Sequence, residues 1–193
     1  GANRLRGNDF NGLTININID NTSFCIEDNC GGIPIEIAEK YAFRMGRASD
    51  EGDNLPTVGI YGIGMKRAIF KIGMSASVTT RNNNTVYKVT IPLDWASSED
   101  IWDFSIEELP NKDILIGGGT RIEIKNINEG IAENWNTTDT LEAFVDRLVK
   151  SIQESYSFII QKGFSIKINE KNIPALPVQL LMADVDTGEA IKP

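Results

Sequence analysis

The chain has 193 residues, of which 41% are hydrophobic and 24% are charged, as in an ordinary globular domain. Its net charge of −8 argues against a surface that wraps nucleic acid, because phosphate binding needs a clustered positive face. The sequence contains no histidine, which excludes Ser-His-Asp and Cys-His catalysis and most zinc sites.

No apolar run is long enough to cross a bilayer, and no signal peptide opens the chain, so we expect no membrane association. A disulfide between Cys25 and Cys30 would close a cramped local loop. We therefore expect two free thiols and a reducing, cytoplasmic location.

Alternating apolar and polar residues predict a hairpin near the start of the chain. Its strands are Leu13–Ile19 and Ser23–Glu27, joined by a turn at residues 20–22. A helix is expected over Pro34–Phe43, with the proline near its first turn. The polar stretch Met45–Pro56 has the composition of a loop.

The rest of the chain alternates helices with hairpins. The expected elements are a helix over Met65–Ile72, a hairpin of Ser75–Thr80 and Thr85–Ile91, irregular structure over Pro92–Lys112, a strand from Ile114–Ile116 across three glycines to Thr120–Ile124, a helix over Thr138–Ile160, and a hairpin beginning with Phe164–Ile168. Because the strands come in hairpins, the pattern predicts an α+β fold. We expect a two-layer sandwich of a mostly antiparallel sheet with helices on one face.

The second strand leads into the motif Asp28-Asn29-Cys30-Gly31-Gly32-Ile33. At a strand end, Asp28 can accept a hydrogen bond from the exocyclic amine of a flat base, and Gly32 would let that base approach the backbone. The alternative is that Asp28 and Asn29 only cap a turn, as these residue types do in most loops.

A glycine-punctuated run, VGIYGIGMK at Val58–Lys66, leads into the next helix. Backbone N–H groups at a helix start can surround phosphates, and the ammonium of Lys66 could reach their oxygens. The run lacks the ending of a P-loop and reverses the order of the Rossmann fingerprint. The alternative is a glycine turn between two helices.

A third motif is Gly118-Gly119-Thr120, which leads into a strand. The hydroxyl of Thr120 can donate to a buried water or carboxylate. The alternative is that Thr120 is simply a β-branched strand residue.

In this order and spacing the three motifs resemble the ATP-binding domain of the gyrase, heat-shock-chaperone, histidine-kinase and MutL superfamily (GHKL), over roughly Leu13–Ile127. The segment GIYGIGMKRAIFKIG is similar to the MORC and heat-shock-chaperone branch. The resemblance implies a Bergerat-type fold that binds ATP under a lid at Met45–Thr57. Positions that match the family's ATP-binding residues are Asp28, Gly32, Ile33, Gly59, Tyr61, Gly62, Ile63, Gly64, Met65, Lys66 and Thr120.

Two departures from the family pattern matter. Cys30 stands where the family has glycine, so Gly31 is expected to take the position with positive φ. The family's first helix carries a glutamate that activates water and an asparagine that binds Mg²⁺, and neither is present. We expect a fragment that lacks this helix, the alternative being a domain that has lost hydrolysis. Glu27 and Glu36 are nearby carboxylates, but no catalytic residue or metal ligand is assigned.

The resemblance divides the chain into an ATP-binding domain over residues 1–135 and, over 136–193, a helix and the start of a transducer-like module. It implies an ATP-dependent conformational switch, with slow hydrolysis in the full-length protein. The implied partners are ATP, ADP, Mg²⁺ and, through elements outside this chain, a second copy in a homodimer. The alternatives are a nucleotide-free scaffold and a sensor histidine kinase catalytic domain. The extended segment Leu141–Ile173 and the Gly-x-x-Gly-x-Gly-x-Lys form argue against the kinase.

Overall fold

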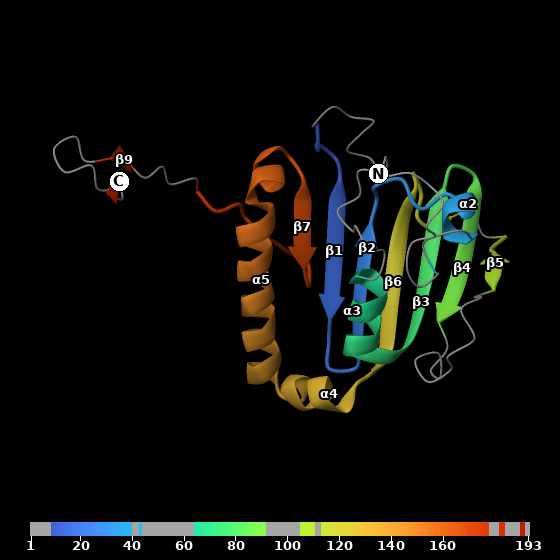
Figure 1. Cartoon of the computed structure of the whole chain (residues 1–193), viewed down its shortest axis with the longest axis horizontal. Coiled ribbons are helices and arrows are strands. Elements are labelled where there is room, and N and C mark those ends of the chain that lie inside the picture. Colours follow the sequence, from blue (N-terminus) through green and yellow to red (C-terminus); the bar gives the residue numbers. More distant parts are fainter. Residues whose placement is uncertain are drawn as a thin grey trace, which may run out of the picture.

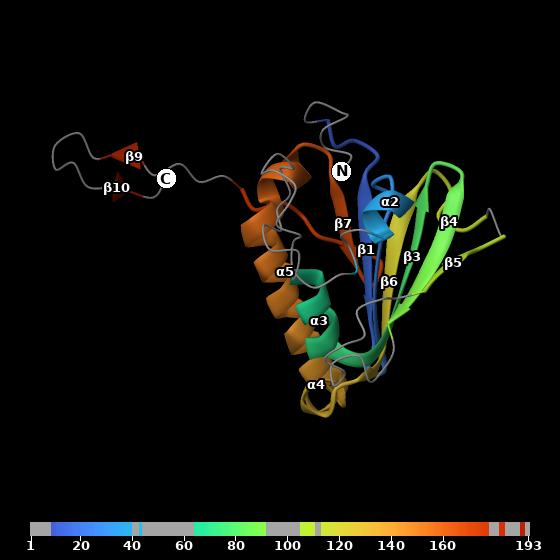
Figure 2. The same cartoon turned by 45° about the vertical axis from the view of Figure 1, so that its right-hand side comes forward.

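The computed structural model describes residues 9–39, 43, 64–91, 105–110, 113–177, 182–183 and 190–191. It contains an eight-stranded sheet in the order β5-β4-β3-β6-β2-β1-β7-β8, with helices on one face (Figures 1 and 2). All neighbouring strands are antiparallel except β1 and β7, which are parallel. The predicted α+β sandwich with a mostly antiparallel sheet is therefore confirmed.

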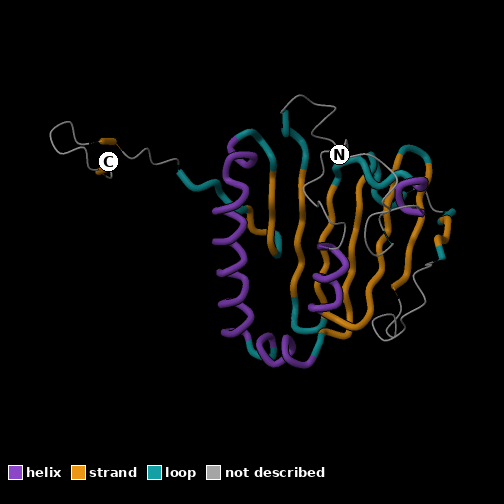
Figure 3. Tube along the Cα trace, viewed as in Figure 1, coloured by secondary structure: helices purple, strands orange, loops and turns teal. Residues whose placement is uncertain are grey.

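Figure 3 shows the helices and strands of the described residues along the chain trace. The strands of the large sheet are β1 (Thr14–Ile19), β2 (Ser23–Asp28), β3 (Gly73–Asn82), β4 (Thr85–Ile91), β5 (Ile106–Glu108), β6 (Gly119–Ile127), β7 (Ser165–Ile168) and β8 (Lys171–Asn172). The helices are α2 (Ile35–Ile37), α3 (Gly64–Ile72), α4 (Glu129–Trp135) and α5 (Thr138–Gln161). A separate two-stranded sheet pairs β9 (Met182–Ala183) with β10 (Ala190–Ile191).

Some expected elements differ from the structure. The helix expected over Pro34–Phe43 begins where predicted, with Pro34 as the N-cap of α2, and residues 38–39 continue it as a π turn. Its end falls among residues 40–42, which lie outside the described residues. The apolar run Ile114–Ile116 lies in a turn, because Leu115 adopts a φ of +51° and Ile116 is 76% exposed instead of packing in a core. The sequence did not predict α4 or β5. The expected lid at Met45–Thr57 lies outside the described residues.

Strand alternation sorts side chains between the two faces of the sheet. On the helix-covered face, Ile17 of β1 and Ile166 and Ile168 of β7 share a core with Ile152 of α5 and Trp135 of α4. A neighbouring cluster places Ile69 of α3 on residues of β3, β4 and β6. The two longer helices therefore cover different halves of the same face.

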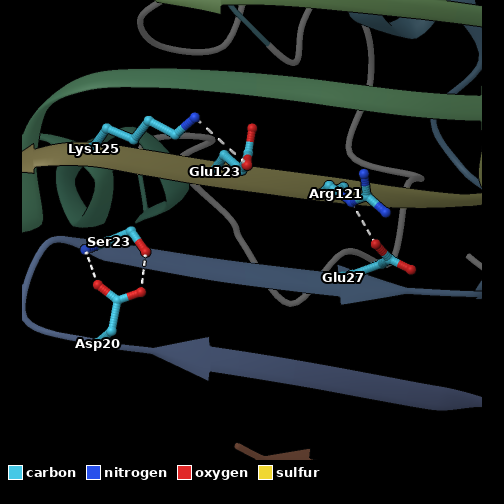
Figure 4. Close-up of polar contacts among 6 residues, drawn as sticks. All are labelled: Asp20, Ser23, Glu27, Arg121, Glu123 and Lys125. Carbon is cyan, nitrogen blue, oxygen red and sulfur yellow. Dashed lines mark hydrogen bonds and ion pairs between the residues drawn. The ribbon is translucent and has the colours of Figure 1, made fainter.

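The opposite face of the sheet is polar, and no described helix covers it. One cross-strand row of register partners runs from β7 to β5 through Lys167, Asn16, Glu27, Arg121, Thr79, Lys88 and Glu107. Figure 4 shows the ion pair between Glu27 and Arg121 and, further along β6, the pair Glu123–Lys125 at 3.8 Å. We call this surface the open face.

The chain beyond β8 lies along α5. Gln153 donates from Nε2 to the carbonyl of Pro174 at 2.9 Å. Ser157 Oγ accepts from the N–H of Leu176 at 2.8 Å, and Gln161 Nε2 donates to the Leu176 carbonyl at 3.0 Å. The three side chains are four residues apart, so they share one face of the helix. They fix the path by which the chain leaves the sheet.

Cys25 and Cys30 are not joined by a disulfide, in agreement with the prediction. No helix in the described part of the chain is long and apolar enough to cross a membrane.

Candidate nucleotide-binding site

Three strands bring their ends together at one end of the sheet. Asp28 of β2 is the register partner of Thr120 of β6, and Thr120 is the partner of Thr80 of β3. Alternation places all three side chains on the helix-covered face. The structure thus brings together the predicted residues Asp28 and Thr120, which lie far apart in the sequence.

The carboxyl group of Asp28 is partly buried at this strand end. Burial raises its pKa, and the neighbouring charge of Glu27 adds to the rise, while hydrogen bonds from Cys30 and from the backbone of Thr120 oppose it. One of these bonds joins the Cys30 N–H to Asp28 Oδ1 at 2.7 Å. A carboxylate has about four lone-pair sites, so Asp28 keeps capacity to accept a hydrogen bond from an amine.

The turn after Asp28 is pressed against the neighbouring strands. Gly31 and Gly32 have φ values of +100° and +69°. A Cβ on Gly32 would lie 1.9 Å from the carbonyl oxygen of Arg81, so the space beside this glycine is taken by the backbone of β3. Cys30 is not among the residues with positive φ, which confirms that Gly31 takes this conformation in its place.

Thr80 holds the turn in place, and sequence analysis missed it. Its hydroxyl oxygen accepts from the N–H of Ile33 at 2.9 Å, and the hydroxyl of Tyr87 donates to the Ile33 carbonyl at 2.8 Å. Thr80 is fully buried and, aromatic residues aside, no other polar side chain among the described residues is buried. The sequence pattern that could have identified Thr80 is the alternation of β3, in which a threonine takes the inward position after Ala76 and Val78.

Helix α3 carries part of the segment that was predicted to bind phosphates. It starts at Gly64 and ends where β3 begins, so its N-terminus is directed back toward the end of the sheet that holds Asp28 (Figure 1). Its first turn has no acidic residue, and this favours an anion at the helix N-terminus. Met65 packs against the core beneath the helix. Lys66 lies in the first turn, and Gly59, Tyr61, Gly62 and Ile63 lie outside the described residues.

A cavity of about 300 Å³ lies near the same strand ends, but largely on the open face. Its walls include Asn16, Glu27, Arg121 and Asp113, as well as Asp28. Since Thr80 and Thr120 face the other way, this cavity is distinct from the predicted nucleotide pocket. Among the described residues, no group of three or more histidine, cysteine, aspartate or glutamate side chains could hold a metal ion.

A mostly antiparallel sheet with helices on one face, an aspartate at a central strand end and a glycine-led helix define an ATP-binding module of the GHKL type. The family model described as histidine kinase-, DNA gyrase B- and HSP90-like ATPase matches residues 8–127, and the chain belongs to this family. The superfamily expected from the motifs is therefore confirmed.

A solved structure shares the fold. The crystal structure of the ATPase and transducer domains of DNA topoisomerase II from Balamuthia mandrillaris matches with a TM-score of 0.56 and 16% identity. The match covers 84% of this chain and 42% of that one, so this chain spans less than half of the topoisomerase structure. No curated protein matches the chain.

Proposed function

We propose that this ATP-binding module acts as an ATP-dependent conformational switch in a larger protein, with the adenine read at the end of β2. The observation that carries the proposal is the convergence of Asp28, Thr120 and the turn at Gly31–Ile33 on the helix-covered face. The N-terminus of α3 is directed toward the same end of the sheet. This arrangement supports a base bound at Asp28 with its phosphates directed toward the N-terminus of α3.

The residues divide into two roles. Asp28 accepts a hydrogen bond from the exocyclic amine of adenine, and Thr120 supports Asp28. Gly32 and Ile33 form the adjoining wall of the pocket. The phosphates lie along residues 59–66, where the backbone N–H groups and the ammonium of Lys66 neutralise their charge. Bound Mg²⁺ would be held mainly by the phosphates, and it would stabilise the charge that develops when water attacks the γ-phosphate. The group that activates this water is not assigned to any residue of the chain.

A switch requires different affinities for ATP in two conformations, because a ligand that binds both equally shifts nothing. We propose that residues 45–57 close over the nucleotide and that slow hydrolysis in the full-length protein resets the switch. The motif GIYGIGMKRAIFKIG supports a place near the MORC and heat-shock-chaperone branch. We also propose that residues 136–193 lead into a transducer-like module, and that dimerisation uses elements outside this chain.

Cys25 and Cys30 are not joined by a disulfide, which supports a reducing compartment such as the cytoplasm.

The test is calorimetric titration with ADP and with a non-hydrolysable ATP analogue, each with and without Mg²⁺. Asp28→Asn is compared with Glu27→Gln, a matched control at the adjacent position on the open face. Loss of a hydrogen bond to a charged group is worth about 1.5–3 kcal/mol, so Asp28→Asn should weaken ADP binding by about 10- to 100-fold. Glu27→Gln should bind like the wild type.

Both variants should keep the circular dichroism spectrum of the wild type, because neither residue lies in the apolar core. Unchanged ADP affinity in a folded Asp28→Asn protein would remove the adenine assignment. Failure of the wild type to bind either nucleotide would favour a nucleotide-free scaffold.

A further inference from the structure

We propose that Thr80 is a positioning residue that fixes the direction of the Thr120 hydroxyl proton, and through it selects 6-aminopurine over 6-oxopurine nucleotides. The proposal rests on the adenine site described above. It concerns Thr80, which contacts residues of the site without lining the pocket itself.

The hydrogen bonds that Thr80 makes with the described residues can be counted. Its hydroxyl has one proton and two lone pairs. Three polar atoms lie within hydrogen-bond distance of Thr80 Oγ1: the Ile33 nitrogen at 2.9 Å, the Gly119 carbonyl oxygen at 3.0 Å and Thr120 Oγ1 at 3.1 Å. The Ile33 N–H can only donate, and the Gly119 carbonyl can only accept. The proton of Thr80 is therefore directed to Gly119, and one lone pair is used by Ile33.

The remaining lone pair of Thr80 faces Thr120. A hydrogen bond forms there only if Thr120 is the donor, so the Thr120 proton turns toward Thr80. In the reverse arrangement the Thr80 proton would point at Thr120. The 3.0 Å contact with the Gly119 carbonyl would then join two oxygens with no proton between them. Because Thr80 is fully buried, bulk water cannot relieve that contact.

The consequence is that Thr120 offers only lone pairs to the pocket. Its register partner on β2 is Asp28, whose carboxylate is also an acceptor. Two neighbouring acceptors match a ligand group that donates, such as the exocyclic amine of adenine or a water oriented by it. A 6-oxopurine would place a carbonyl oxygen against both, and a site built of unmatched polar groups discriminates strongly.

The experiment measures the affinities for ADP and for inosine diphosphate, which carries a 6-oxo group, by calorimetry. Thr80→Val removes the hydroxyl while keeping the shape of the side chain, and Thr80→Ser keeps the hydroxyl as the conservative control. The wild type and Thr80→Ser should prefer ADP. In Thr80→Val the Thr120 hydroxyl is free to rotate and donate, so the preference should fall by about tenfold.

A purely structural role would weaken both nucleotides equally and leave the ratio of affinities unchanged. An unchanged ratio in Thr80→Val, with the wild type binding ADP, would overturn the proposal while the adenine site stands. If Thr80→Val fails to fold, Thr120→Val tests the same acceptor, because it keeps the bonds of Thr80 to Ile33 and Gly119. Its ratio should fall as well, and an unchanged ratio would also overturn the proposal. Absence of ADP binding by the wild type would instead reject the underlying site.

Discussion

The two adjacent glycines after β2 allow a sharp test of how the site is packed. Gly31 and Gly32 both have positive φ, so alanine at either position costs about 1–2 kcal/mol of backbone strain. They differ in their surroundings. A Cβ on Gly31 would meet nothing within 4 Å, whereas a Cβ on Gly32 would lie 1.9 Å from the Arg81 carbonyl oxygen. Gly31→Ala is therefore the matched control for Gly32→Ala.

The extra cost at Gly32 follows from the strand behind it. Real Cβ atoms essentially never come closer than 3.0 Å to another heavy atom, so the turn or β3 must move by about 1 Å. Arg81 pairs with Val86 on one side and with Gly119 on the other, so movement weakens ladder hydrogen bonds worth about 1 kcal/mol each. We expect Gly31→Ala to lower the free energy of unfolding by about 1–2 kcal/mol, and Gly32→Ala by about 3–5 kcal/mol.

Urea denaturation followed by circular dichroism measures both values, with the m-values compared to show that the unfolded states are alike. ADP titration of each folded variant then shows whether the displaced turn also weakens nucleotide binding. Equal losses of stability for the two variants would refute the close contact between Gly32 and Arg81.

Three further predictions concern the same sheet. Burial raises the pKa of Asp28 in the folded state, so the stability that the protonated carboxyl contributes is present at low pH and is lost as the pH rises through that raised pKa. In thermal denaturation, Asp28→Asn should therefore gain stability relative to the wild type as the pH rises above the ordinary range of an aspartate, and a difference that stays constant with pH would contradict this. Burial opposes the shift at Asp20, but hydrogen bonds from the next turn residues lower its pKa below 3.8; Asp20→Asn should cost about 0.5–1 kcal/mol at pH 7, and urea denaturation should show this cost shrinking as the pH falls through the lowered pKa and the carboxylate is protonated. Asn169 has a φ of +44°, and its side chain makes two hydrogen bonds with the backbone of Ile19. Asn169→Ala should lower the free energy of unfolding by about 2–3 kcal/mol in urea denaturation, and Asn169→Gly should lower it less because glycine tolerates this φ.

Local sequence patterns predicted those elements whose formation depends on near neighbours. The alternation of residues 13–19 and 85–91 and the helical period of residues 138–160 correspond closely to β1, β4 and α5. The strand prediction for Ile114–Ile116 was wrong, because an apolar triplet has the composition of a strand whether or not its side chains pack in a core. The parallel pairing of β1 with β7 is a long-range contact, and no hairpin signal marks it.

The candidate site shows the same division. Asp28 and the glycines beside it could be found in the sequence, because an acidic residue at the end of an apolar strand followed by two glycines is a recognisable local pattern. Thr80 does not stand out, since threonine is common in strands. Its importance arises only from three groups in other segments that converge on one oxygen.

The path of the chain beyond β8 has a mechanical consequence. Ser165 at the start of β7 pairs with Thr14, and the next residue of β1, Ile15, pairs with Asp28. Tension applied beyond Pro177 would first load the hydrogen bonds that Gln153, Ser157 and Gln161 make to the exit segment. Once these break, the load would pass through β8 and β7 to β1, the strand next to that of Asp28. The hydrogen bonds between the exit segment and α5 thus shield the central strands from a pull on the chain beyond Pro177.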